Sequence, residues 1–415
     1  MILFCEECGT RNDIDQKQIT GNTYNFSCQV CREALVVSLV DKSKGKTVQA
    51  ALESQGASPD DHSVDPLKVL VVDDSRIIRR VLCDIINSDE SKTVVGEAAH
   101  GKEALEKLRE CKPDVITLDI NMPVMDGLTT LKHIMIGNPT PTVMISALTQ
   151  EGASETFDSL KYGAIDFLPK PSQVRGGDLK SQQEEILRKI DLVAQVQIES
   201  VRYLRRASKE KTPDNGAEEI NACQCVLVLG ASEGGYGALL NVIPRLRKEL
   251  PAAYVAVMQQ APNHLDAFAR YLNDCSKINV QRAVDGTMLQ GGTCYILAST
   301  EQLSLEQDQN NLKLKVVTTV SGSNGNGTID GIMAEAARLL HENAAGVILT
   351  GKCDDGLQGL GEIINNGGSA FIQDPRSCLF KETPMAAANM YDVEFLVSDK
   401  QLAGAITAYV KSHTR

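Results

Sequence analysis

Long hydrophobic runs and an excess of basic residues are both missing from this sequence. No apolar segment approaches the roughly 20 residues that a membrane-spanning helix needs, and residues 1–7 lack the basic stretch and apolar core of a signal peptide. The 42 Lys and Arg residues are outnumbered by 54 Asp and Glu residues, and the net charge of -12 disfavours a broad nucleic-acid surface. We therefore expect a cytoplasmic protein that neither inserts into membranes nor binds nucleic acid, and whose partners are other proteins.

The composition is that of a folded protein with more than one domain. A chain of 415 residues exceeds what one ordinary core holds, and its hydrophobic and charged fractions, 42% and 23%, are typical of globular proteins. Its 12 cysteines are spread along a chain without an export signal. Because the cytosol keeps thiols reduced, metal ligation or simple burial is favoured over disulfide bonds.

Four of the cysteines form two C-x-x-C pairs near the N-terminus, Cys5 with Cys8 and Cys28 with Cys31. Two such pairs supply the four sulfurs of a closed tetrahedral Zn2+ site. A segment of about 40 residues buries too little apolar surface to fold securely alone, so bound zinc would provide much of its folding free energy. We expect a zinc ribbon over residues 1–41 and a linker over residues 42–66.

Residues 67–173 contain short apolar runs that alternate with helical stretches, the pattern of an α/β domain with a parallel sheet. The expected strands are 69–72, 94–96, 115–118, 142–145 and 165–168. Residues 174–222 are predicted to be a helical linker, with a helix from residue 178 to about residue 208. A second β/α alternation begins at Cys223 and occupies residues 223–415.

Three acidic residues follow two of the expected strands. Asp73 and Asp74 come after the first strand, and Asp119 follows the third. Since the carboxyl ends of parallel strands meet at one edge of a sheet, these carboxylates are expected to converge. Clustered carboxylates repel one another unless a hard cation neutralises them, and Mg2+ suits such a set while leaving positions for water and phosphate oxygens. The pattern predicts phosphoryl transfer to a carboxylate.

Two further polar residues end later strands of the same domain. Ser146 offers a hydroxyl and Lys170 an ammonium, and both groups can bind a phosphoryl oxygen. With these residues in place, the segment from 67 to about 172 resembles the receiver domain of response regulators. The motifs that carry the resemblance are Val-Asp-Asp-Ser at 72–75, Leu-Asp-Ile-Asn-Met-Pro-Val-Met-Asp-Gly at 118–127, Ser146-Ala147 and Lys170-Pro171.

The resemblance implies a flavodoxin-like fold in which Asp119 is the phosphoacceptor. It assigns Mg2+ to Asp73, Asp74 and Asp119, together with the carbonyl of Asn121. It also implies that a sensor histidine kinase supplies the phosphoryl group.

The same resemblance gives roles to residues of the last two strands. Ser146 and Lys170 are expected to sense the phosphate, and Phe167 stands where the family has its switch aromatic. The Lys170–Pro171 peptide bond is expected to be cis.

The second β/α region opens with a possible nucleophile. Residues 230–234 read Gly-Ala-Ser-Glu-Gly, a G-x-S-x-G turn between an expected strand at 225–229 and a helix. Such a turn can lift the hydroxyl of Ser232 toward solvent at a helix N-terminus. On its own, the motif is equally compatible with a structural or phosphate-binding turn.

Further landmarks make residues 223–415 resemble the methylesterase domain of chemotaxis response regulators. These landmarks are the segment 346–356, the pair Gln373-Asp374, residues 377–380 and residues 384–386. The resemblance implies a Rossmann-like, doubly wound domain that hydrolyses glutamyl methyl esters on chemoreceptors and deamidates certain glutamines. Ser232 corresponds to the family nucleophile and Asp355 to the aspartate of its triad.

The sequence departs from that family at the triad histidine. The family's Gln-His-Met-Pro segment is Gln-Gln-Ala-Pro here, at residues 259–262, which places Gln260 at the histidine position. A glutamine cannot take the serine proton near neutral pH, and losing the histidine of such a triad can reduce turnover by a factor on the order of 10^6. His264 is the nearest candidate substitute, and His341 and His413 are more distant ones.

Two smaller departures lie beside it. Glu233 stands where the family usually has Thr, and Lys352-Cys353 replaces Met-Gly before the triad aspartate. A carboxylate near a developing oxyanion is unfavourable, whereas the ammonium of Lys352 and the backbone amides could stabilise that charge.

Three hypotheses for function follow. The first is a phosphorylation-regulated interaction protein that binds chemoreceptor cytoplasmic helices or other chemosensory proteins and has an impaired methylesterase-like domain. The alternative is an active methylesterase and glutamine deamidase with a substitute base. Transcriptional regulation through the ribbon is disfavoured by its acidic charge and by the lack of a helix-turn-helix pattern.

Overall fold

The computed structural model divides the chain into two compact units, one formed by residues 1–142, 171–191 and 198–205 and the other by residues 143–170, 192–197 and 206–415. The residues that it describes are 2–4, 11–13, 23–27, 34–38, 65–146, 153–171, 179–196, 198, 223–259, 262–308, 311–318 and 328–414. No helix within these ranges is long and apolar enough to cross a bilayer.

The N-terminal segment contains two antiparallel strand pairs. Strand β1 (Ile2–Phe4) pairs with β2 (Arg11–Asp13), and β3 (Thr23–Ser27) pairs with β4 (Ala34–Ser38). The cysteines predicted to bind zinc, Cys5, Cys8, Cys28 and Cys31, lie outside the described residues.

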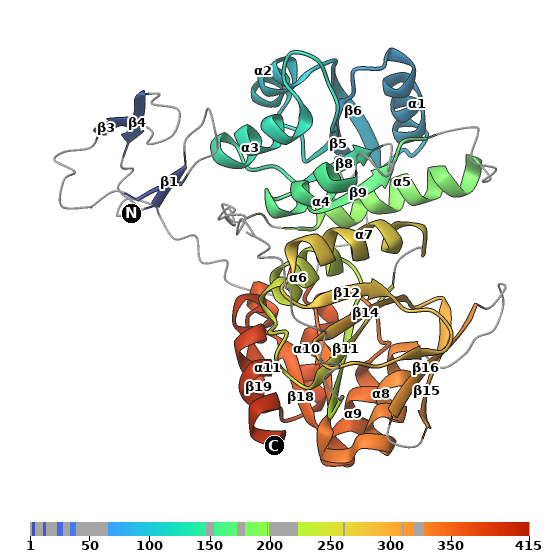
Figure 1. Cartoon of the computed structure of the whole chain (residues 1–415). Helices are drawn as coiled ribbons and strands as arrows, with labels where there is room; N and C mark the ends of the chain where they lie inside the picture. Colours follow the sequence, from blue (N-terminus) through green and yellow to red (C-terminus); the bar gives the residue numbers. More distant parts are fainter. Residues whose placement is uncertain are drawn as a thin grey trace, which may run out of the picture. The chain divides into compact units, whose positions relative to one another are not determined.

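The first α/β region is built on a five-stranded sheet. Figure 1 shows the helices that alternate with its strands. The strand order β6-β5-β7-β8-β9 is that of the flavodoxin-like fold, so the predicted fold class is confirmed. Its elements in chain order are β5 (Leu67–Val72), α1 (Arg76–Asn87), β6 (Lys92–Ala98), α2 (Gly101–Cys111), β7 (Val115–Asp119), α3 (Gly127–Gly137), β8 (Thr142–Ser146), α4 (Ala153–Lys161) and β9 (Asp166–Pro169).

Helix α5 (Leu179–Ala194) follows this sheet, within the segment predicted to be a helical linker. Its apolar side chains Ile186, Ile190 and Val193 are buried. Asp191 on the helix pairs with the buried ammonium of Lys92 on β6 at 2.9 Å. The helix therefore packs against the elements that precede it, as an amphipathic face with a 3.6-residue period requires.

One expectation for this region is wrong. The described residues contain no cis peptide bond, so the Lys170–Pro171 bond is trans. The trans form is the lower-energy state of most X–Pro bonds by about 0.5–1 kcal/mol.

The C-terminal region is built on a parallel sheet of seven strands in the order β12-β14-β11-β10-β17-β18-β19. The doubly wound fold is thus confirmed. The strands are β10 (Cys225–Ala231), β11 (Ala252–Met258), β12 (Asn279–Arg282), β14 (Thr293–Ala298), β17 (Ala344–Ile348), β18 (Ser369–Gln373) and β19 (Phe395–Val397). The central strands are almost wholly apolar and buried, which is the pattern of strands covered on both faces.

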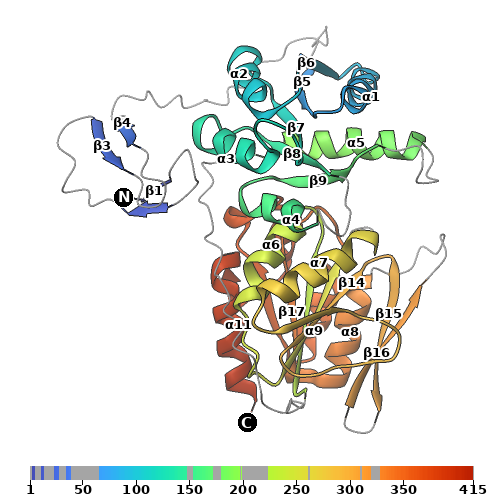
Figure 2. The same cartoon turned by 45° about the horizontal axis from the view of Figure 1, so that its top comes forward.

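Helices connect these strands, and α8 and α9 lie side by side (Figure 1). They are α6 (Gly235–Val242), α7 (Pro262–Cys275), α8 (Thr328–Leu340), α9 (Leu357–Asn365), α10 (Glu382–Met390) and α11 (Asp399–His413). A separate antiparallel sheet joins β13 (Thr287–Met288), β16 (Asn311–Thr318) and β15 (Glu301–Asp308). Figure 2 shows its two long strands, β15 and β16, as a hairpin at one side of this region.

The strand order places a topological switch point beside β10. From β10 the sheet extends through β11 and β14 to its edge strand β12 on one side, and β17 lies on the opposite side of β10. In open α/β sheets, ligands bind beyond the carboxyl ends of the strands at such a point. The loops after β10, β11 and β17 are therefore the expected location of a functional site.

Candidate functional site

Three carboxylates gather at the carboxyl edge of the first sheet. Asp73 and Asp119 are buried and Asp74 is exposed, and each offers an oxygen within 4.8 Å of the oxygens of the other two. The guanidinium of Arg79 donates to the backbone carbonyls of Asp73 (2.8 Å) and Asp74 (3.1 Å) and so holds the turn that carries them. This donor set of hard oxygens fits a cation such as Mg2+.

The turn after β7 is tightly packed around Asp119. A Cβ placed on Gly127 would lie 2.0 Å from the Asp119 carbonyl oxygen, and the amide of Gly127 donates to the Ile120 carbonyl at 2.8 Å. Only glycine allows this close approach of backbones. Asn121 lies exposed in the same turn.

The predicted phosphate-sensing residues end β8 and β9. The amide of Lys170 donates to the carbonyl of Ser146 at 2.9 Å, and the Ser146 hydroxyl lies 2.9 Å from that of Thr156 on α4. Sequence reasoning did not single out Thr156, because a threonine inside an amphipathic helix carries no distinguishing signal. A hydroxyl pair couples the end of β8 to α4 directly.

Phe167 on β9 is buried in a group of aromatic rings. Its ring centroid lies 5.6 Å from that of Phe157 on α4, 5.0 Å from Tyr236 on α6 and 5.6 Å from His264 on α7. The predicted switch aromatic is therefore packed against side chains from three different helices.

Ser232 lies at the switch point of the second sheet, directly after β10. Its backbone amide donates to the backbone carbonyl of Thr350, which follows β17, at 3.2 Å. The side chain of Ser232 is buried. A Cβ on Gly351 would lie 2.0 Å from Ser232 Oγ, and Gly234 adopts a φ of +75° at the start of α6. Both glycines are thus required by the geometry around the serine.

A backbone amide donates a hydrogen bond to the Ser232 hydroxyl. The N–H of Lys352 donates both to Ser232 Oγ at 2.9 Å and to Glu233 Oε2 at 3.1 Å. The side-chain ammonium of Lys352 has other partners, Glu382 Oε1 at 3.2 Å and the amide oxygen of Gln195. The carboxylate of Glu233 and the hydroxyl of Ser232 therefore share one N–H donor.

A thiol also borders the serine. Burial raises the pKa of Cys353, the nearby carboxylates of Asp355 and Glu233 raise it further, and hydrogen bonds with the Ser232 and Thr383 side chains offset part of the rise. The Cys353 thiol is therefore neutral near pH 7 and a poor nucleophile.

Asp355 accepts hydrogen bonds from backbone amides. Its carboxylate accepts from the amides of Ile329 (3.2 Å) and Asp330 (2.9 Å) in the first turn of α8. Asp330 in turn accepts from the amides of Gly356 (2.9 Å) and Gly359 (2.6 Å) at the start of α9. Asp355 thus caps α8, the helix that carries Asp330, and Asp330 caps α9, the helix that follows Asp355.

The three histidines weighed as substitute bases make contacts of their own. Gln260, the residue expected at the histidine position, is outside the described residues. His264 packs its ring against Phe167, and His413 Nδ1 lies 3.0 Å from the Tyr409 carbonyl oxygen. His341 sits in a short 3-10 helix with a φ of 50°.

Two polar residues that sequence reasoning did not assign hold the loops around Ser232. The Thr350 hydroxyl lies 2.9 Å from both the amide and the carbonyl of Phe380 and 3.2 Å from the carbonyl of Glu233. Gln373 accepts from the Thr350 amide at 2.9 Å and donates to the Ser377 carbonyl at 3.2 Å. The loops after β10, β17 and β18 are therefore bonded to one another.

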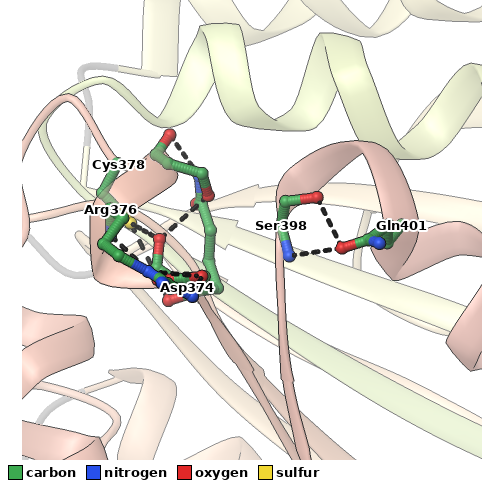
Figure 3. A network of polar contacts seen from close by, with 7 residues as sticks. Asp374, Arg376, Cys378, Ser398 and Gln401 are labelled. Atoms are coloured by element: carbon green, nitrogen blue, oxygen red, sulfur yellow. Dashed lines mark hydrogen bonds and ion pairs between the residues drawn. The ribbon is translucent and has the colours of Figure 1, made fainter.

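Figure 3 shows the next part of this loop, after β18. The Asp374 carboxylate accepts from the amide and the guanidinium of Arg376, and the Cys378 thiol donates to the Asp374 carbonyl at 3.4 Å. On a separate turn, Ser398 and Gln401 form the capping box of α11. The polar groups of both turns are thus satisfied locally.

Comparison with known proteins assigns both regions. A family model described as "Response regulator receiver domain" matches residues 69–177, and one described as "CheB methylesterase" matches residues 227–406. The crystal structure of the response regulator domain of Thermotoga maritima CheB is 46% identical in sequence, covers 32% of this chain and 99% of that chain, and has a TM-score of 0.30.

Curated relatives cover nearly the same span. A protein from Pyrococcus horikoshii named protein-glutamate methylesterase/protein-glutamine glutaminase is 36% identical over 352 residues, which are 83% of this chain and 94% of the relative. A relative of the same name from Caldanaerobacter subterraneus is 33% identical over 362 residues, 84% of this chain and 98% of the relative. The chain therefore belongs to the family of protein-glutamate methylesterases/protein-glutamine glutaminases, in which a receiver domain precedes a CheB methylesterase domain.

Proposed function

We propose that this chain is a chemosensory response regulator, phosphorylated on Asp119, whose methylesterase-type domain serves mainly in protein interaction and has little hydrolase activity. The observation that carries the proposal is the contrast between the two sites. In the receiver site, the carboxylates of Asp73, Asp74 and Asp119 lie close together. In the second, the triad base is replaced by Gln260, and Ser232 Oγ accepts a hydrogen bond from a backbone amide.

In the receiver, Asp119 accepts a phosphoryl group from a sensor histidine kinase. Asp73, Asp74, Asp119 and the Asn121 carbonyl would hold Mg2+, which would supply the positive charge that lets three carboxylates coexist with a phosphoryl group. Ser146 and Lys170 then bind the phosphoryl oxygens. Because Ser146 lies 2.9 Å from Thr156, a shift of its hydroxyl changes the contact with α4.

The partners follow from the family. Its named relatives act on protein glutamate esters and protein glutamines. We infer that this chain still binds chemoreceptor cytoplasmic helices, or other chemosensory proteins, in the cytoplasm. Binding requires a complementary surface but no base, so it survives the loss of the histidine.

A methanol-release assay tests this function. The purified chain, phosphorylated with acetyl phosphate and Mg2+, is incubated with chemoreceptors that carry labelled methyl esters, beside its Ser232→Ala variant. We expect equal background release from both proteins and equal co-sedimentation with receptor-containing membranes. Methanol release that depends on Ser232 would establish instead the active enzyme, with His264 or another group as its base.

We further propose that Cys5, Cys8, Cys28 and Cys31 bind one Zn2+. In support, each C-x-x-C pair falls between two strands that pair antiparallel, β1 with β2 and β3 with β4. Elemental analysis should find one zinc per chain, and Cys5→Ser with Cys28→Ser should remove it. Cys111→Ser is the matched control and should leave the zinc in place.

The domain limits proposed for this architecture are 1–41 for the ribbon, 42–66 for a linker, 67–173 for the receiver, 174–222 for the connecting segment and 223–415 for the methylesterase-type domain. The helix α5 in the connecting segment packs with the receiver through Asp191 and Lys92, which favours a role as the receiver's last helix. Limited proteolysis should cut on the C-terminal side of α5 more readily than on its N-terminal side.

A further inference from the structure

We propose that the Glu233 carboxylate accepts the hydrogen bond that an oxyanion at Ser232 would need. Glu233 thereby keeps the serine site inactive, whichever residue stands at position 260. The inference rests on the proposed loss of hydrolase activity and assigns it a second, separate cause. Restoring the histidine alone would then fail to restore the enzyme.

The geometry of the Lys352 amide carries the argument. Attack of Ser232 Oγ on an ester carbonyl places a negatively charged oxygen next to Oγ, and that oxygen needs preorganised N–H donors at about 2.7–3.1 Å. The Lys352 N–H is a backbone donor that contacts Oγ, at 2.9 Å, and the same hydrogen is shared with Glu233 Oε2 at 3.1 Å. Because a carboxylate is a stronger acceptor than a neutral ester oxygen, it holds this donor against an incoming carbonyl.

The position of Glu233 is fixed by its neighbours. It directly follows Ser232, and its backbone carbonyl lies 3.2 Å from the Thr350 hydroxyl, which also contacts Phe380. Gly234, next in the chain, has a φ of +75° and would place a Cβ against Phe380 and Leu379. The backbone on both sides of the carboxylate is thus held in one conformation.

The negative charge of Glu233 also affects the neighbouring thiol of Cys353. The pKa of the Cys353 thiol is raised by burial first, and the carboxylates of Asp355 and Glu233 add to the rise. A thiolate formed beside Ser232 is therefore disfavoured by Glu233, and an oxyanion formed there experiences the same repulsion.

The side-chain ammonium of Lys352 contacts other groups. It pairs with Glu382 Oε1 at 3.2 Å, contacts the amide oxygen of Gln195 and lies 5.5 Å from the centre of the Phe380 ring. The backbone amide of Lys352 therefore contacts Ser232, whereas its side-chain ammonium contacts Glu382.

The test compares hydrolysis of p-nitrophenyl acetate by the full chain and by three variants: Gln260→His, Glu233→Thr, and the two combined. In this reaction Ser232 Oγ bonds to the acetyl carbon, the introduced imidazole takes the hydroxyl proton, and p-nitrophenolate leaves; water then releases acetate. Loss of one oxyanion donor typically reduces turnover by about 10²–10³-fold. We expect kcat of the double variant to exceed that of Gln260→His by about 10²-fold, while Glu233→Thr alone stays at background.

Two matched controls accompany these variants. Adding Ser232→Ala to the double variant should return the rate to background, which shows that the gain comes from this serine. Glu382→Gln in the Gln260→His background removes a carboxylate that contacts the ammonium of Lys352 rather than its amide, and it should leave the rate unchanged. A double variant no faster than Gln260→His would overturn the proposal, and so would Gln260→His with full activity on its own.

A second measurement does not depend on activity. In ¹H–¹⁵N spectra of the full chain, Glu233→Gln should shift the Lys352 amide resonance and speed its exchange with solvent, because the charge-assisted bond is weakened. An unchanged Lys352 amide would contradict the proposal even if no variant hydrolysed ester. Failure of the proposed function has a different signature, namely Ser232-dependent methanol release by the unmodified chain.

Discussion

Several side chains near Ser232 bond to backbone groups of neighbouring loops rather than to one another. Asp355 and Asp330 cap the starts of α8 and α9 reciprocally, and Gln373 accepts from the amide of Thr350. Each such bond satisfies an N–H that would otherwise be buried without a partner at a helix or strand end. Residues that resemble parts of a catalytic site thus also stabilise the fold.

Asp355→Ala should therefore lower the stability of the fold. The substitution leaves the amides of Ile329 and Asp330 without their acceptor, and loss of such a cap costs about 0.5–2 kcal/mol. Urea denaturation should give a lower midpoint for Asp355→Ala than for Asp354→Ala, the exposed neighbour. Equal midpoints would show that the two amide contacts contribute little.

The buried thiol at the start of β10 predicts a pH dependence. Burial raises the pKa of Cys225 to about 11, so the fold favours the neutral thiol. The contribution of this thiol to the free energy of unfolding is complete below the pKa of the thiol in the unfolded chain, near 9. It is lost as the pH rises from 9 toward the folded-state pKa of about 11. Between pH 8 and pH 10 the loss should be about 1 kcal/mol. Urea midpoints should fall less over this interval in Cys225→Ala than in the unmodified chain, whereas parallel declines would assign the effect to other groups.

At the scale of elements, α4 packs on α6 and α7 through aromatic side chains. Phe157 of α4 lies 5.9 Å from Tyr236, 5.1 Å from Phe268 and 5.3 Å from Tyr271, measured between ring centroids. Around Tyr271 the contact is also polar, because its hydroxyl accepts from Lys161 at 2.6 Å and donates to Asp158. The helix that follows Ser146 is thus bonded to the helix that follows residue 260.

Tyr271→Phe should weaken this helix contact. It removes a hydroxyl that bonds two side chains of α4, and loss of hydrogen bonds to charged groups costs about 1.5–3 kcal/mol. Tyr236→Phe is the matched control, since the Tyr236 hydroxyl is buried and has no hydrogen-bond partner among the described residues. Thermal melting should show a lower midpoint for Tyr271→Phe and an equal or higher one for Tyr236→Phe; the reverse order would contradict this assignment.

The sequence predicted the elements well where the signal is local. The buried strands β5 and β7 follow from unbroken apolar runs, and the convergence of Asp73, Asp74 and Asp119 follows from their positions at strand ends. The antiparallel pairing of β15 with β16 was not anticipated, because neither strand contains the long unbroken apolar run on which the other strand predictions relied. The bond from the Lys352 amide to Glu233 joins residues 119 positions apart and depends on the neighbour relation of β10 and β17, which no local pattern contains.

At the scale of the whole molecule, both regions use the same arrangement. Each is a parallel sheet with polar residues at the carboxyl ends of its strands: Asp119 is the last residue of β7, and Ser232 directly follows β10. The acidic cluster has the donor set for a cation, whereas the proposed function gives the serine site no base. The proposal therefore rests mainly on control by phosphorylation.

Phosphorylation should depend on a divalent cation. Removing Mg2+ with a chelator leaves the carboxylates of Asp73, Asp74 and Asp119 without the charge that a phosphoryl group requires, so labelling by acetyl phosphate should stop. Asp73→Ala should weaken binding of Mg2+, read as a change in intrinsic tyrosine fluorescence or by calorimetry. Asp114→Ala, which alters an exposed carboxylate bonded to the Lys68 amide, should not.

The intact mass of the full chain after incubation with acetyl phosphate and Mg2+ tests the account most directly. The wild-type chain should gain the mass of one phosphoryl group, and Asp119→Asn should gain none. A wild-type chain that stays unmodified while remaining folded, or an Asp119→Asn chain that is modified to the same extent, would contradict the account.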